Sequence, residues 1–202
     1  MSIMVAMSLF ALSMSISPGP VNLITLTTGT NLGIKKTMPF VSGATVGFTL
    51  LLYLLGLSYV QLAGEYNQII NVLSLLGNGY VFYMGYKLLT SKGKVGITPS
   101  TQPSFIHGFL LQWLNPKAWG ACIVGITAFN LSESHYQLTV FVAIYFMVCY
   151  LSITAWALFG VKINELIHTP QHLKTFNTLM GGCLVVIALY LGINMLLKAF
   201  DL

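Results

Sequence analysis

Six long apolar stretches constrain this chain more than any other feature of its sequence. A bilayer core of about 30 Å is crossed by about 20 mostly apolar residues in an α-helix. The stretches lack the alternation of a membrane-spanning β-strand, so a helix is the spanning structure that they favour. The sequence therefore predicts an all-α integral membrane protein with six transmembrane helices, at residues 2–28, 38–63, 69–89, 105–129, 138–161 and 176–197.

The composition excludes the soluble classes of protein. Charged residues make up 6% of the chain and hydrophobic residues 56%, whereas a soluble domain carries about 25% charged residues. The net charge of +5 comes from scattered lysines with no arginine and no basic stripe, so we expect no nucleic-acid partner. The partner that the composition predicts is the lipid bilayer.

The lysines predict how the helices are oriented. With six helices, three connections lie on one side of the membrane, and seven lysines lie in or beside them. Because lysine is enriched in cytoplasmic connections, that side is predicted to be cytoplasmic, with both termini periplasmic. The seven residues are Lys35, Lys36, Lys87, Lys92, Lys94, Lys162 and Lys174.

The chain is predicted to be one transporter domain, 1–202, built from two halves. A polar segment at 91–104, the predicted cytoplasmic loop, separates 1–90 from 105–202. Each half holds three helices, and a three-helix offset inverts one half relative to the other. The first and fourth helices are interrupted midway, by residues 17–20 (SPGP) and 115–117 (NPK). Paired interruptions of this kind indicate the central site of a transporter, although each could also be a mere kink.

The interruptions suggest a chemistry. Proline has no N–H and clashes with the carbonyl four residues before it, so each proline frees backbone acceptors. Such groups must meet protein, water or ligand, because lipid offers them no partner. A broken helix also offers N–H groups to a carboxylate and carbonyls to an ammonium. A zwitterionic amino acid carries both groups and is the class of substrate that fits.

Lys117 is the one charged side chain in the middle of a spanning stretch. Ionisable residues at that depth are usually functional, so it is predicted to pair with an anionic group. The structural alternative is that it caps the carbonyls freed by Pro116. Asn22 and Asn115 either bond the broken backbone or also contact substrate, and Gln112 lies one turn before Asn115. The candidate substrate-binding residues are Pro18, Gly19, Pro20, Asn22, Gln112, Asn115, Pro116 and Lys117.

No catalytic residue, cofactor or metal is predicted. The carboxylates all lie outside the spanning stretches, and no nucleotide-binding or metal-ligating motif is present. Cys122, Cys149 and Cys183 have no paired spacing and are interpreted as packing residues. A membrane thiol-relay oxidoreductase is the enzyme alternative, but it needs a cysteine in each half, and the first three stretches contain none.

Two motifs resemble the LysE/RhtB family of amino-acid exporters. The first is residues 17–23 (SPGPVNL), followed by the Lys35–Lys36 pair and by Gly43 and Gly47. The second is residues 109–117, which end in QWLNPK. The resemblance covers nearly the whole chain and implies a bacterial inner-membrane exporter of amino acids or close derivatives, driven by protons. The second motif most resembles the branch that exports cysteine and O-acetylserine.

The chain departs from the family pattern at one position. Many members carry an acidic residue directly after the second glycine of the second stretch, where this chain has Phe48. The function expected is therefore secondary export of small neutral amino acids or derivatives, of the cysteine/O-acetylserine or threonine/homoserine type. A passive channel or a small membrane assembly subunit is the alternative. The sequence leaves open whether the chain forms a homo-oligomer.

Overall fold

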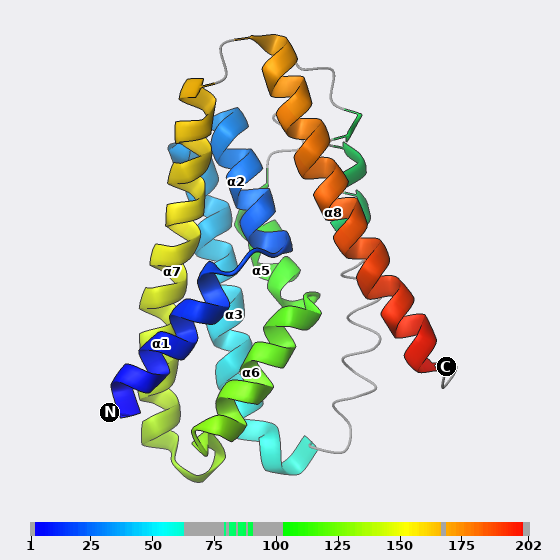
Figure 1. The fold of residues 1–202 in the computed structure, drawn as a ribbon. Coiled ribbons are helices and arrows are strands. Elements are labelled where there is room, and N and C mark those ends of the chain that lie inside the picture. Colours follow the sequence, from blue (N-terminus) through cyan, green and yellow to red (C-terminus); the bar gives the residue numbers. More distant parts are fainter. Residues whose placement is uncertain are drawn as a thin grey trace.

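The structure, a computed structural model, describes residues 3–62, 79, 81–83, 85–87, 89–90, 103–166 and 169–199. Every regular element within these residues is a helix, which confirms the predicted all-α class for this part of the chain. Figure 1 shows the helices as a bundle with α8 along one side. In chain order they are α1 (Ile3–Ile16), α2 (Pro20–Leu32), α3 (Ile34–Leu62), α5 (Phe105–Trp113), α6 (Pro116–Ala128), the 3-10 helix η2 (Leu131–Glu133), α7 (His135–Leu166) and α8 (Pro170–Ala199).

Two of the described helices are long and apolar enough to cross a membrane, over Ile34–Ser58 in α3 and His135–Glu165 in α7. Helices α1 and α2 meet at 62°, and they add a third span if this bent pair crosses the membrane as one. The pair α5–α6 and helix α8 cover the fourth and sixth predicted stretches. Most of the third stretch, 69–89, and most of the predicted loop, 91–104, lie outside the described residues. The six-span arrangement stays a prediction.

The interruption predicted in the first stretch is a true helix break. α1 ends at Ile16, and α2 begins at Pro20, which occupies its first position. Proline is favoured there because the first N–H of a helix has no partner within the helix. Gly19 before it is extended, with φ −174°. The chain therefore turns by 62° between two helices that would otherwise form one rod.

The interruption predicted in the fourth stretch is also confirmed. α5 ends at Trp113, and α6 begins at Pro116. Asn115 is the N-cap of α6, and its side-chain oxygen accepts a hydrogen bond from the Lys117 backbone N–H at 3.1 Å. This is the cap geometry that asparagine favours.

Helix α2 lies at the centre of the bundle although it is rich in polar residues. All of its residues from Pro20 to Asn31 are buried. The hydroxyls of Thr25, Thr28 and Thr30 each donate to the carbonyl four residues earlier, which satisfies them within the helix. The Thr30 hydroxyl also lies 2.9 Å from the Gly160 carbonyl of α7, so the two carbonyls share its single proton. Because α2 is buried, the helix break at its N-terminus lies inside the bundle.

Glycines let α3 and α5 pack with their backbones close together. A Cβ on Gly47 would lie 2.7 Å from the Phe109 carbonyl oxygen, and a Cβ on Gly108 would clash with the Phe40 carbonyl. Small residues at helix contacts allow such approach in membrane proteins. The contact fixes α5, and with it the second break, against the long α3.

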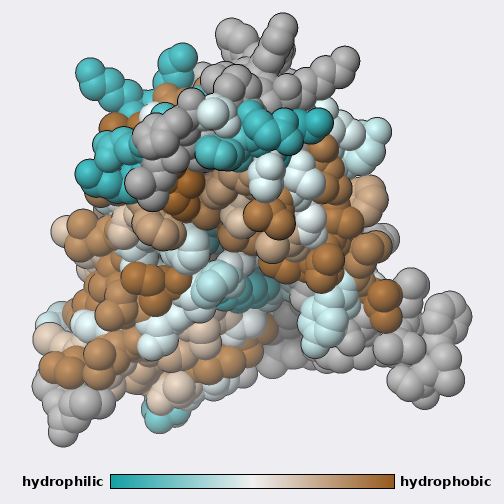
Figure 2. Space-filling model, turned by 45° about the horizontal axis from the view of Figure 1, so that its top comes forward, coloured by the Kyte–Doolittle hydropathy of each residue, from teal (hydrophilic) through white to brown (hydrophobic). Residues whose placement is uncertain are grey.

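Four of the described lysines lie toward one end of the molecule, whereas Lys117 is in α6 at mid-molecule and Lys198 is in the last turn of α8, at the opposite end of that helix. The junction of α2 with α3 and the connection from α7 to α8 both lie at the top of Figure 1, and Figure 2 shows hydrophilic side chains there above an apolar band. Lys35 and Lys36 begin α3, while Lys162 and Lys174 flank the α7–α8 connection. Lys92 and Lys94 lie outside the described residues. The arrangement agrees with the lysine asymmetry on which the predicted orientation rests.

Candidate functional site

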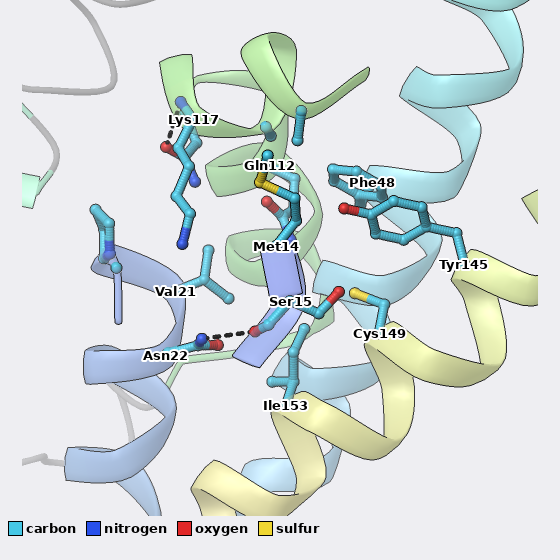
Figure 3. A pocket seen from close by; sticks show the side chains of 15 residues that line it. Met14, Ser15, Val21, Asn22, Phe48, Gln112, Lys117, Tyr145, Cys149 and Ile153 are labelled. Atoms are coloured by element: carbon cyan, nitrogen blue, oxygen red, sulfur yellow. Dashed lines mark hydrogen bonds between the residues drawn. The ribbon is translucent and has the colours of Figure 1, made fainter. Parts of the chain in front are cut away.

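A cavity of about 50 Å³ lies where the two helix breaks meet (Figure 3). A water molecule needs roughly 10–15 Å³ by this measure, so the cavity has room for a small polar molecule or a few waters. Its walls come from α1, α2, α3, α5, α6 and α7. Six of the eight candidate residues line it: Gly19, Pro20, Asn22, Gln112, Asn115 and Lys117.

The other two candidates, Pro18 and Pro116, act on the cavity through the backbone. The Pro18 carbonyl accepts a hydrogen bond from the Lys117 ammonium at 3.3 Å. Pro116 is the first residue of α6, so it sets where that helix begins. Neither side chain is among those that line the cavity.

The carbonyls freed at the first break are bonded by side chains of the protein. Asn22 Nδ2 donates to the carbonyls of Ser15 and Ser17, at 2.8 and 2.9 Å. Trp156 Nε1 of α7 donates to the Ile16 carbonyl at 3.1 Å. The sequence left protein, water and ligand open as partners for such carbonyls, and at these three the partner is protein. Asn22 bonds the broken backbone, which was one of the two alternatives for it, and α7 supplies an indole N–H from far along the chain.

Lys117 joins the second break to the first. Its Nζ donates to the Ser17 carbonyl at 3.0 Å, to the Ser17 hydroxyl at 2.8 Å and to the Pro18 carbonyl at 3.3 Å. The structural alternative for Lys117 placed its contacts at Pro116. The lysine instead reaches the opposite half of the chain, because the two breaks face each other across the cavity.

Gly19 makes room for that lysine. A Cβ at Gly19 would lie 3.3 Å from Lys117 Nζ and 3.4 Å from its Cδ. The backbone of Gly19 is extended, so any effect of a side chain there would come from crowding the lysine and not from backbone strain.

The two half-helices that begin at the breaks differ in their capping. Asn115 caps α6, and Trp119 Nε1 bonds the Trp113 carbonyl at the end of α5 at 2.7 Å. At the second break, side chains of α6 and of its N-cap residue thus bond nearby backbone groups. Helix α2 has Gly19 at its N-cap and no side-chain cap. Val21 and Asn22, in the first turn of α2, line the cavity, and the positive end of a helix attracts an anion.

Two neutral oxygens are left for a ligand. Both N–H bonds of the Asn22 amide are used on the break, so its Oδ1 is free to accept. The Gln112 side chain is buried at the cavity wall and makes no hydrogen bond with the part of the chain that the structure describes. Each of these oxygens can accept a hydrogen bond from an ammonium group.

The remaining wall was missed by the sequence analysis. Tyr145, buried in α7, stacks its ring against Phe48 of α3 at 4.4 Å between centroids. No spacing pattern distinguishes these residues from ordinary core side chains in an apolar helix. The sequence analysis noted Phe48 only because it departs from the family pattern. The remaining lining residues are Met14, Ser15, Val21, Phe48, Ala118, Ala121, Tyr145, Cys149 and Ile153.

Charge in the cavity is limited to one cation. Lys117 is its one charged lining residue, and no carboxylate lines it. Within the described ranges, no three His, Cys, Asp or Glu side chains group as metal ligands. Cys122 and Cys149 are buried and Cys183 is exposed, all as free thiols. The cavity offers hydrogen bonds and one positive charge.

Comparison with known proteins places the chain in a family. The family model of the LysE type translocator matches residues 12–195. A cysteine/O-acetylserine efflux protein of Klebsiella pneumoniae is 29% identical over 125 residues. Proteins of the same name from Escherichia coli strain K12 and Shigella flexneri are 28% identical over 122 residues. Each match covers 60% of this chain and 60% of the relative. No solved structure is significantly similar to the chain.

Proposed function

The chain belongs to the LysE type translocators, and we propose that it exports a small neutral amino acid or derivative across the bacterial inner membrane. The observation that carries this proposal is the cavity at the meeting point of the two helix breaks. It presents an uncapped helix N-terminus, one ammonium and two neutral oxygens within a largely apolar wall. The relatives named as cysteine/O-acetylserine efflux proteins support the same class of substrate.

The substrate carboxylate is proposed to bind at the start of α2. Val21 and Asn22 line the cavity together with Lys117, and the N–H groups of the first two and the Lys117 ammonium would bind the carboxylate. Carboxylates are stabilised at helix N-termini because the N–H groups point at them and the helix dipole has its positive end there. Lys117 would exchange one of its bonds to the break for a bond to the carboxylate, which keeps its charge paired.

The substrate ammonium is proposed to bind Asn22 Oδ1 and the Gln112 side-chain oxygen. Both are neutral acceptors at the cavity wall. A second positive charge, as in lysine or arginine, would meet no carboxylate on the cavity wall and would face Lys117. Like charges in a site of low dielectric repel strongly, so a neutral substrate fits and a cationic one does not.

The transport cycle is proposed to use six spans in two inverted halves, 1–90 and 105–202. Residues 91–104 would lie in the cytoplasm, with both termini in the periplasm. The breaks at corresponding places in the two halves and the position of Lys35, Lys36, Lys162 and Lys174 toward one end support this arrangement. The site would then lie near the membrane midplane, where one half can rock against the other.

The driving force is proposed to be the proton gradient, with Lys117 as the proton-binding group. Lys117 is the one charged group at the cavity, and lysine can lose its proton when its surroundings disfavour the charge. Arginine keeps its charge at every accessible pH. A pH gradient should therefore drive export by the wild type and no longer drive it in Lys117→Arg. If the Lys117→Arg protein is still driven by the gradient, the substrate's own amine is the proton carrier.

Transport in proteoliposomes tests the function. Liposomes containing the purified protein would be loaded with radiolabelled serine, cysteine, threonine, alanine or lysine, and efflux followed with and without an imposed pH gradient. We expect efflux of one or more neutral amino acids above that from protein-free liposomes, and none of lysine. Efflux of no amino acid, or of lysine alone, would refute the proposal.

A further inference from the structure

One buried hydroxyl in the cavity has no partner. Ser15 Oγ, near the end of α1, is shielded from solvent and makes no hydrogen bond within the described residues. Most serine and threonine hydroxyls in these helices donate back to the carbonyl three or four residues earlier, as Ser13 does to Leu9 at 2.8 Å. Ser15 is at the cavity wall and does not do this. Thr45 and Thr154 also have unpartnered hydroxyls, but neither residue lines the cavity. A buried polar group left unpaired is costly, which makes it a candidate contact for a bound molecule.

Two further polar groups stand beside that hydroxyl. Figure 3 shows Ser15 turned toward the sulfur of Cys149, with the Tyr145 hydroxyl directed into the same space. Ser15 is within interaction range of both groups, yet its hydroxyl has no bond of ordinary hydrogen-bond geometry. Tyr145 and Cys149 are 1% and 3% exposed. Serine, tyrosine and cysteine side chains can each donate and accept, so together they match a group that does both.

The walls around these groups are apolar and closely packed. Phe48 stacks on the Tyr145 ring at 4.4 Å between centroids, and Ile153 is 2% exposed. Met14 closes the space from α1. The end of the cavity that Ser15, Tyr145 and Cys149 line is therefore bounded by apolar side chains.

We propose that Ser15, Tyr145 and Cys149 form the side-chain subsite of the transported amino acid, and that it selects a short side chain ending in a hydroxyl or a thiol. The inference rests on the proposed function, since it assumes that the charged groups bind at Lys117, Asn22 and Gln112. A methyl group in the same position would leave the Ser15 hydroxyl unpaired. A site built to bond a substrate hydroxyl rejects the analogue that lacks it.

Binding to the unaltered protein gives the first measurement. Dissociation constants would be measured by calorimetry on the purified protein for two pairs of ligands, L-serine with L-alanine and L-cysteine with L-2-aminobutyrate. The members of each pair differ only in the terminal group of the side chain. We expect the hydroxyl or thiol member to bind about tenfold more tightly, as one or two hydrogen bonds imply.

Variants locate the source of the preference. Ser15→Ala and Tyr145→Phe each remove one hydroxyl and keep the fold of the wall. In both variants the ratio of the two dissociation constants within each ligand pair should fall toward one. The affinity for alanine should not change. Ser13→Ala and Tyr150→Phe are matched controls, because they make the same changes in α1 and α7 at residues that do not line the cavity. Both controls should keep the wild-type preference.

The outcomes separate this inference from the proposed function. Equal binding within both pairs, or a preference that survives in both Ser15→Ala and Tyr145→Phe, would overturn the subsite and leave amino-acid export standing. An equal loss of affinity for serine and alanine in the variants would also overturn it, since that marks a structural effect. Binding of none of the four amino acids would overturn both proposals.

Discussion

Lys117 connects the two breaks through a single side chain. Its ammonium bonds the Ser17 and Pro18 carbonyls, but Asn22 also bonds Ser17. Removing the lysine therefore takes a donor from the Pro18 carbonyl and from the Ser17 hydroxyl, and that hydroxyl still donates to the Met14 carbonyl at 3.0 Å. Removal also relieves the cost of keeping a charge at membrane depth, about 2.5–3.5 kcal/mol on insertion scales. These effects oppose each other, so the stability of the fold should depend little on Lys117. The affinity for an anionic ligand should depend on it strongly.

We predict that Lys117→Met folds normally and binds substrate about 10–100-fold more weakly. The factor follows from a hydrogen bond to a charged group, which contributes about 1.5–3 kcal/mol. Thermal melting and calorimetric titration with the transported amino acid measure the two properties. Lys174→Met, at an exposed position in α8, is the control and should change neither. A large drop in melting temperature with unchanged affinity would make Lys117 a purely structural clasp.

Two tryptophans at the second break offer a matched pair. Trp119 Nε1 bonds the Trp113 carbonyl at 2.7 Å, while Trp113 Nε1 is buried and has no partner in the described part of the chain. Trp119→Phe should destabilise the protein by about 0.6–1.7 kcal/mol, the range for hydrogen bonds between membrane helices. Trp113→Phe removes an unpaired donor and should cost less. Equal melting temperatures for the two variants would show that the indole bond adds nothing.

At the residue scale, the sequence predicted which residues form the site better than it predicted the hydrogen bonds that they make. Proline, asparagine and lysine stand out in an apolar helix, which is why Pro20, Asn22 and Lys117 could be singled out. Which carbonyl each side chain bonds depends on how distant helices pack. Trp156 and Tyr145 could not be found in this way, because an aromatic residue in an apolar helix has the same local pattern whether it packs or bonds.

The helices themselves follow from local rules, and the breaks most clearly. Pro20 and Pro116 each begin a helix, as proline's missing N–H dictates. The bend of 62° between α1 and α2 could not be predicted, since it depends on the bonds that Asn22, Trp156 and Lys117 make across the break. The third stretch lies mostly outside the described residues, so its prediction stays untested.

We predict that replacing Pro18 and Pro20 together by alanine separates stability from transport. Proline costs about 3 kcal/mol in a helix interior, so alanine would let α1 and α2 join into one helix, and the melting temperature should hold or rise. Efflux should fall to that of protein-free liposomes, because the α2 N-terminus is lost from the cavity. Pro39→Ala, inside α3, is the control and should transport normally. Normal efflux by the double variant would remove the first break from the site.

The whole molecule has an uneven distribution of charge that predicts its orientation. Thr169 is exposed in the α7–α8 connection, at the end where Lys162 and Lys174 lie, and Glu133 is exposed between α6 and α7. Single cysteines at these positions, in a background without native cysteines, should differ toward an impermeant thiol reagent on intact cells. Glu133→Cys should react and Thr169→Cys only after lysis. The reverse pattern would overturn the predicted orientation.

The central claim is that the substrate occupies the cavity between the breaks, and the native cysteines test it most directly. Cys149 lines the cavity, whereas Cys122 is equally buried and does not. Two single-thiol proteins, each keeping one of these residues, would be treated with a small thiol reagent with and without a saturating concentration of the transported amino acid. The claim predicts that substrate slows the modification of Cys149 and leaves Cys122 unchanged. An equal effect on both thiols, or none on Cys149, would contradict it.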